Sequence, residues 1–269
     1  MPDAGPLRNI RLLAAYDGTD FLGWQRQGRR SPEAGRNGAA GKSGGRTVQG
    51  EIERALEKVH KHPVNLTGAG RTDSGVHAAG QVANFYTDIK SIVPERFVPA
   101  LNTFLPRDVR ILEAAETRQD FHARFDARLR TYRYHFVCGR HALPHESRYS
   151  LQLWRYPNLE LLNAYGRLLL GERDCSVFAG AGDKSRSRSR YISRAVFFIE
   201  GGRLIFEISA NAFLWKMVRS VAGTFLYREE RKTPPGDLAA IIASGNRGLA
   251  GPTLPSQGLF LWKVDYFRE

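Results

Sequence analysis

Strand-like and helix-like segments are interspersed along the whole chain, and this mixture constrains the fold more than any other feature of the sequence. The clearest strand is RTYRYHFVC, residues 130–138, in which tyrosine, phenylalanine and cysteine alternate with arginine, histidine and valine. The clearest helix is TVQGEIERALEKVHKHP, residues 47–63, where apolar residues keep one face at helical spacing until Pro63 marks the stop. Such a pattern favours an α+β fold.

The same mixture occurs twice, once in each half of the chain. The first half predicts strands over 8–16, 79–87 and 108–117 and a short helix within 94–106. The second half predicts a helix over 158–170, a hairpin over 194–210 that turns at Gly201-Gly202, a buried stripe within 212–227, a helix over 236–244 and a closing strand over 259–267. We therefore expect two similar halves, residues 1–136 and 137–269, although no sequence repeat proves duplication.

The charge of the chain indicates its class of partner. The sequence carries 40 Lys and Arg against 27 Asp and Glu, a formal net charge of +13. Arginine dominates, and its planar fork suits phosphate and stacks on bases. An excess of this size indicates nucleic acid as the partner, although a basic surface that serves only solubility is an alternative.

Two features bear on the compartment of the chain. No apolar run approaches the ~18–20 residues that a membrane span needs, and the start, MPDAGPLRNI, has neither a signal-peptide nor a transit-peptide pattern. Cys138 and Cys175 lie far apart and belong to no CxxC pair, so two small buried side chains are expected instead of a zinc site or a disulfide. We expect a cytoplasmic protein that is not bound to a membrane.

A stretch rich in glycine, serine and arginine, residues 28–46, has almost no large apolar residue and is expected to be a mobile loop. Within it, GAAGKS resembles a phosphate-binding P-loop. The spacing fails, because Arg36 stands where the pattern needs a glycine, and the segment follows no strand. A basic loop that touches RNA backbone is the better interpretation.

The familiar catalytic motifs are missing from the sequence. HALPH, residues 141–145, has two histidines four apart, but its proline argues against the helix that would align them, and no HExxH occurs. The zinc-deaminase pattern and the GxSxG elbow are also missing. We therefore expect chemistry without a metal and without a cofactor.

One short stretch, GAGRTDSGVHA at residues 68–78, does carry a candidate catalytic group. Its glycines allow a sharp turn that would project Asp73 and let a substrate approach the backbone. At neutral pH this carboxylate is an anion, and Arg71 beside it favours that form. Three roles suit such a group, namely nucleophile, general base or stabiliser of a developing cation. A turn-capping aspartate with a surface ion pair is the plainer alternative.

A second stretch interleaves arginine with aromatic residues. FHARFDARLRTYRY, residues 121–134, offers guanidinium groups for phosphates and rings for unstacked bases, a mixture that suits RNA. Tyr132 lies in the predicted strand, so a rigid element would aim its ring. Alternation alone leaves open whether Tyr132 is instead a core aromatic.

Seven segments form an ordered set over nearly the whole chain. They are YDGTDFLGWQRQ (16–27), TVQGEIERAL (47–56), GAGRTDSGVHAAGQVANF (68–85), LNTFLPRDV (101–109), FHARFDARLRTYRY (121–134), ANAFLWKMVRSVAG (210–223) and GLFLWKVDY (258–266). Together they resemble the bacterial tRNA pseudouridine synthase A family. The resemblance implies isomerisation of uridine to pseudouridine at positions 38 to 40 of the tRNA anticodon stem-loop, without a cofactor. It also implies a homodimer and two related ferredoxin-like or RRM-like halves whose antiparallel sheets join around a central basic cleft.

The resemblance also implies roles for individual residues. Asp73 matches the catalytic aspartate, Arg71 the arginine that helps displace the target base, and Tyr132 the ring that stacks on it. Arg219 matches the basic partner of the aspartate, and Leu259 the apolar residue under the base. The implied RNA contacts are Phe121, His122, Ala123, Arg124 and Phe125 and, in a second group, Arg186, Arg188 and Arg190.

Some alternatives stay open at the level of sequence. Asp73 could attack carbon or remove a sugar proton to give a glycal. A catalytically silent RNA-binding protein would keep the arginines and aromatics without needing Asp73, and a hydrolase with an Asp nucleophile would release free uracil. The chain departs from the family at Ser74, where alanine is usual, in the length of the 28–46 loop, and in the basic run KSRSRSR at 184–190.

Overall fold

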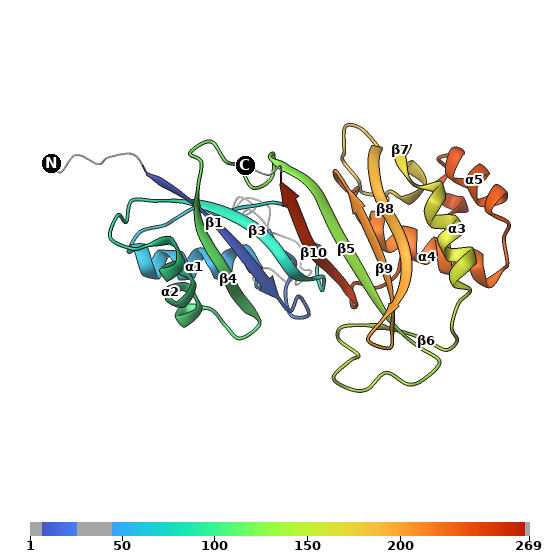
Figure 1. Cartoon of the computed structure of the whole chain (residues 1–269), viewed down its shortest axis with the longest axis horizontal. Coiled ribbons are helices and arrows are strands. Elements are labelled where there is room, and N and C mark those ends of the chain that lie inside the picture. Colours follow the sequence, from blue (N-terminus) through green and yellow to red (C-terminus); the bar gives the residue numbers. More distant parts are fainter. Residues whose placement is uncertain (1–6, 26–44, 267–269) are drawn as a thin grey trace, which may run out of the picture. The chain divides into compact units, whose positions relative to one another are not determined.

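A computed structural model describes residues 7–25 and 45–266 of the chain, which divides into two compact units, Met1–Asp126 and Ala127–Glu269 (Figure 1). The second unit begins with strand β5 (Ala127–Cys138), whose antiparallel partners β9 and β10 both belong to the same unit. The boundary expected after residue 136 therefore falls inside a strand that is held along its length by its two neighbours.

In its described residues, 7–25 and 45–126, the first unit is an antiparallel sheet with two helices. Its strands run in the order β4 (Val109–Thr117), β1 (Arg8–Tyr16), β3 (His77–Thr87), and the short β2 (Thr67–Gly68) pairs with β3. Helix α1 (Val48–His60) packs on α2 (Phe97–Phe104), which follows the 3-10 turn η1 (Pro94–Arg96). Thr47 caps α1 by accepting a hydrogen bond from the Gly50 N–H.

The second unit is a larger sheet with three helices. Its antiparallel order is β10 (Leu259–Tyr266), β5, β9 (Arg203–Ala210), β8 (Ser189–Glu200), β7 (Gly171–Asp174), and β6 (Leu151–Leu153) pairs with β5 in parallel. Its helices are α3 (Leu159–Leu168), α4 (Met217–Glu230) and α5 (Pro235–Ala243), with 3-10 turns η2 (Ser176–Phe178) and η3 (Arg247–Leu249). The rings of Phe197, Phe206 and Phe225 form the centre of its core.

Most predicted elements are present, and the α+β class is confirmed. The β8–β9 hairpin turns at Gly201 and Gly202, both with positive φ, as the pair of glycines predicts. Leu214 of the predicted stripe is buried, but it lies ahead of α4, which begins at Met217. The strands β6 and β7 were not predicted, because three half-buried residues and four mostly exposed residues show no readable alternation. The ferredoxin-like likeness of the halves and the basic cleft stay predictions.

Three expectations from the sequence concern residues outside the candidate site. Residues 28–44 of the expected loop, including GAAGKS, lie outside the described residues. Cys138 and Cys175 are both buried free thiols, as expected, and burial raises the pKa of each to about 11. Within the described ranges, every helix is too short or too polar to span a bilayer.

Candidate active site

Asp73 lies in the loop between β2 and β3 of the first unit. The loop closes where the Val76 N–H donates to the Asp73 carbonyl oxygen at 3.2 Å, and Gly75 adopts a positive φ of 76°. A side chain at Gly75 would strain that turn. Asp73 is half-buried, whereas Arg71 is exposed. The loop geometry thus presents the carboxylate on a tight, glycine-dependent turn, as the sequence predicts.

The segment from Tyr16 to Trp24 holds this loop from one side through Thr72. The Trp24 N–H donates to the Thr72 carbonyl oxygen at 3.1 Å. The buried hydroxyls of Tyr16 and Thr72 share a hydrogen bond of 2.8 Å. The residue directly before Asp73 is therefore fixed by both its backbone and its side chain.

Phe21 holds the other side of the loop. Its carbonyl oxygen accepts the Gly75 N–H at 3.3 Å and the Ser74 hydroxyl at 3.1 Å. Asp73 thus sits between two clamped neighbours. The Ser74 hydroxyl adds one hydrogen bond to this clamp, which the segment Tyr16–Trp24 forms around the loop.

Two glycines of the same segment allow its close approach. A Cβ on Gly18 would lie 2.0 Å from the Val76 carbonyl oxygen, and one on Gly23 would lie 2.4 Å from the Thr72 carbonyl oxygen. Gly23 also has a positive φ of 106°. The Gly18 N–H donates to Nδ1 of the fully buried His77 at 3.0 Å. Only glycine fits these two positions without moving the loop backbone.

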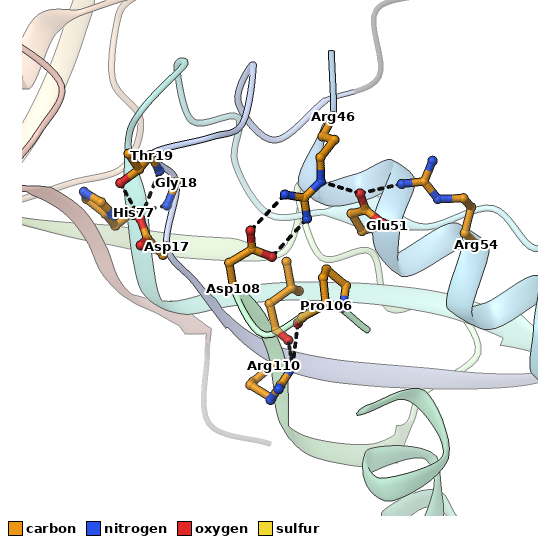
Figure 2. A network of polar contacts seen from close by, with 11 residues as sticks. Asp17, Gly18, Thr19, Arg46, Glu51, Arg54, His77, Pro106, Asp108 and Arg110 are labelled. Carbon is orange, nitrogen blue, oxygen red and sulfur yellow. Dashed lines mark hydrogen bonds and ion pairs between the residues drawn. The ribbon is translucent and has the colours of Figure 1, made fainter. Parts of the chain in front are cut away.

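A polar network around Arg46 and Asp108 contacts the segment Tyr16–Trp24 (Figure 2). The Arg46 guanidinium donates two hydrogen bonds to the Asp108 carboxylate, at 2.9 and 3.0 Å, and a third to Glu51 at 2.8 Å. It also lies 4.4 Å from the ring centre of Phe21. The hydrogen bonds that Arg46 donates to Asp108 and Glu51 raise the pKa of Arg46. Arg46, the last residue of the expected loop, is thus tied to the fold in a bidentate pair.

The network continues to the turn at Asp17. The Asp17 N–H donates to the Asp108 carbonyl oxygen at 3.0 Å, and its carboxylate accepts from the N–H and hydroxyl of Thr19. The same carboxylate lies 3.2 Å from Nδ1 of His77 (Figure 2). Because that nitrogen accepts the Gly18 N–H, we treat the approach to Asp17 as turn packing and not as an ion pair.

The second unit holds Tyr132, on strand β5. Tyr132 pairs with Leu261 on β10 and Ile208 on β9 and is only 8% exposed. Its ring meets Phe213 edge to face, with centres 5.1 Å apart. Leu259 lies two residues before Leu261 on β10, so its side chain shares the face of Tyr132. Ring and apolar side chain therefore lie on the same face of one sheet, and their roles stay predictions.

Arg219 lies in the first turn of α4 and is anchored to a nearby loop. Its Nε donates to the Leu254 carbonyl oxygen at 2.7 Å, and the next carbonyl, of Pro255, accepts the Tyr134 hydroxyl at 2.7 Å. Burial raises the pKa of Tyr134, and the charge of Arg219 lowers it by less. Arg219 is thus near the same stretch of β5 that carries Tyr132.

The expected RNA contacts at 121–125 divide into two groups by exposure. Phe121 and Ala123 are buried, and the amide of Asn84 ties both into the unit through their backbone. Phe125 is 75% exposed, Arg124 is also exposed, and the His122 ring stacks on Phe125 at 4.2 Å. Side chains that could meet RNA are therefore His122, Arg124 and Phe125.

The second group of expected RNA contacts lies in the loop before β8 and at the start of that strand, which includes Arg190. Arg186 and Arg188 are exposed. Arg190 is half-buried and donates to the carbonyl oxygens of Ser187 and Ser189. Two of the three arginines are therefore open to a phosphate, and the third shapes the loop.

The predicted site residues thus fall in both units: Asp73 and Arg71 in the first, and Tyr132, Arg219 and Leu259 in the second. Across residues 7–25 and 45–266, His, Cys, Asp and Glu form no group of three or more that could hold a metal ion. Sequence reasoning missed the clamp of Tyr16–Trp24. The glycines of YDGT and FLGW were its only signal, because the carbonyls they face come from a distant segment.

Comparison with known proteins agrees with the resemblance. A family model described as tRNA pseudouridine synthase matches residues 12–126 and 166–267. A tRNA pseudouridine synthase A of Treponema denticola is 52% identical over 96% of this chain and 93% of its own length. Those of Treponema pallidum and Brachyspira hyodysenteriae are 46% and 38% identical, over 91% and 98% of this chain and 84% and 100% of their own lengths. The chain therefore belongs to the tRNA pseudouridine synthase family, a family of isomerases.

Proposed function

We propose that this chain converts uridine to pseudouridine in tRNA, at positions 38 to 40 of the anticodon stem-loop, without a cofactor. Family membership over nearly the whole chain supports the reaction class, and the excess of basic residues suits the substrate. The observation that carries the proposal is the half-buried carboxylate of Asp73, on a loop whose neighbours Thr72 and Ser74 are both clamped.

In the proposed reaction, the target uridine first leaves the base stack, which costs a few kcal/mol. Arg71 is proposed to help displace the base, and Tyr132 and Leu259 to hold the uracil between a ring and an apolar side chain.

The chemical step exchanges one bond of the uracil for another. The bond from C1′ to N1 breaks, the ring turns, and a bond from C1′ to C5 forms, with loss of the proton at C5 and uptake of a proton at N1. Asp73 would either attack carbon or remove a sugar proton, and Arg219 is proposed as its basic partner, which would favour the ionised carboxylate. We further propose that the enzyme works as a homodimer in the cytoplasm.

Mapping pseudouridine in tRNA incubated with and without the protein tests this proposal. We expect new pseudouridine at positions 38 to 40 and nowhere else in the tRNA. Modification at other positions would contradict the proposed positions 38 to 40. Release of free uracil would show hydrolysis and contradict isomerisation. Binding of tRNA without any product would favour a silent RNA-binding protein.

A further inference from the structure

One exposed tryptophan of the second unit is held in an unusually fixed position. Trp215 is 44% exposed although it lies in the apolar run AFLWKMV. Its backbone N–H donates to the Asp183 carboxylate at 2.6 Å, and its backbone carbonyl oxygen accepts the Gly180 N–H at 2.9 Å. An exposed indole whose backbone is tied at both ends is preorganised for contact with a partner.

Two glycines let the chain lie directly against this indole. A Cβ on Gly180 or on Gly182 would lie 2.8 Å from a carbon of the Trp215 ring. Asp183, the next residue, joins the backbone of Trp215 to the basic segment 184–190, because its other carboxylate oxygen accepts the Ser185 N–H at 2.9 Å. Burial raises the pKa of Asp183, but hydrogen bonds from Trp215 and Ser185 and the charge of Arg190 lower it by more.

A cation adjoins the ring. The Lys216 ammonium lies 4.2 Å from the centre of the Trp215 ring, and Lys216 has a positive φ of 60°. A lysine in this left-handed conformation is uncommon and fixes the direction in which its side chain leaves the backbone. An exposed cation–π contact is weak, so a stacked base and its phosphate can replace it.

The place of these residues in the fold indicates what they would contact. Trp215 follows Phe213, which packs on Tyr132, and Lys216 directly precedes α4, which carries Arg219. All of these residues belong to the second unit. A ring, an ammonium group and the exposed Arg186 and Arg188 match the base and phosphates of unpaired RNA.

We propose that Trp215 and Lys216 form a binding site for an unpaired nucleotide of the tRNA, with the indole stacking on its base and the ammonium group pairing with its phosphate. The site adds to the residues expected to hold the target uridine. This inference rests on the proposed tRNA substrate, but it concerns binding and can be measured without turnover.

Substitution of the ring tests the stacking. Trp215→Leu is expected to weaken tRNA binding roughly 5- to 100-fold, whereas Trp215→Phe keeps a ring and should lose much less. Trp154→Leu is the matched control, because Trp154 is 73% exposed in the same unit and its ring contacts His141. Equal binding by wild type and Trp215→Leu would overturn the site, as would equal losses in the Leu and Phe variants.

Substitution of the cation tests the phosphate contact. Lys216→Asn removes the charge and keeps a residue that tolerates positive φ. The slope of log binding constant against log salt concentration should fall by about 0.7 to 0.9 in this variant and stay unchanged in Trp215→Phe. An unchanged slope in Lys216→Asn would remove the ammonium from the proposal.

Fluorescence keeps the inference testable if the Leu variant fails to fold. Stacking on a base should quench Trp215, so tRNA should quench wild-type emission more than that of Trp215→Phe. Equal quenching would contradict the site. If wild type binds tRNA and shows these effects but makes no pseudouridine, the proposed function fails and the site stands; if it makes pseudouridine without these effects, only the site fails.

Discussion

The Asp73 loop of the first unit and the Tyr132 strand of the second hold their side chains by different means. Around Asp73, backbone carbonyls of Thr72, Val76 and Phe21 face N–H groups or glycines at distances that leave no room for a side chain. Around Tyr132, a regular sheet and a neighbouring ring determine the position. The acid therefore depends on backbone fit, and the aromatic ring on side-chain packing.

The largest effect is expected from a substitution that disturbs the backbone fit around Asp73. In Gly18→Ala, the new Cβ would collide with the Val76 carbonyl oxygen and push the loop that carries Asp73, so turnover should fall roughly 100-fold while tRNA binding changes little. Gly236→Ala is the control, since nothing lies within 4 Å of its Cβ position. Single-turnover rates and tRNA affinity measure both. Normal turnover in Gly18→Ala would show that the loop tolerates displacement.

The next effect concerns the ring on the strand. Tyr132→Leu removes a stacking surface from a position that is otherwise well packed, and turnover should fall about 10- to 100-fold. Tyr132→Phe keeps the ring and should stay within a few fold of wild type. Rates of pseudouridine formation measure this comparison. A loss in Phe as large as in Leu would assign the role to the hydroxyl group and not to stacking.

A third prediction tests an ion pair on the same two strands, on the opposite face of the sheet from the Tyr132 ring. Glu207 on β9 accepts a 2.7 Å hydrogen bond from Arg133 on β5. Burial raises the pKa of Glu207, but Arg133 and Arg194 lower it by more, to below its ordinary 4.5. The stability that this lowered pKa contributes is therefore fully present above pH 4.5 and is lost as the pH falls through the lower folded-state value.

Glu207→Gln should accordingly lower the free energy of unfolding by roughly 1.5–3 kcal/mol at pH 7. Urea unfolding of both proteins between pH 7 and pH 3 measures the difference, which should shrink below pH 4.5. A difference that stays constant over that range would mean that the charge of Glu207 contributes nothing and that its shape alone matters.

The smallest effect is expected from a substitution that removes one hydrogen bond of the clamp. Ser74→Ala deletes the hydroxyl that donates to the Phe21 carbonyl oxygen, while the Gly75 N–H still donates to the same atom. One hydrogen bond contributes about 1 kcal/mol, so turnover should fall by no more than about fivefold. The single-turnover rate measures it. A drop as large as that of Gly18→Ala would give Ser74 a role beyond positioning.

The sequence predicted those parts of the molecule that depend on local periodicity. Strands such as β1 and β5 and helix α1 follow directly from spacing, and Asp73 stood out because glycines surround it. The clamp could not be predicted, since it depends on how closely Gly18 and Gly23 approach carbonyls about fifty residues away in the chain. Tertiary contacts of this kind leave no period in the sequence.

The RNA contacts show the same limit. Alternating aromatic and basic residues at 121–125 gave no sign that Phe121 is buried while Phe125 is exposed. The predicted buried stripe within 212–227 likewise gave no sign that the ring of Trp215 is exposed beside Lys216. Exposure is decided by the packing of the whole unit, which spacing alone does not encode.

The central claim is that the Asp73 carboxylate carries the chemistry, and one substitution tests it directly. Asp73→Asn keeps the shape of the side chain and removes its charge. With tRNA labelled by tritium at uracil C5, this variant should bind as wild type does and release tritium on the order of 10³-fold more slowly or not at all. Asp88→Asn, at an exposed aspartate of the same unit, should release it at the wild-type rate. If folded Asp73→Asn released tritium at the wild-type rate, that result would contradict the account.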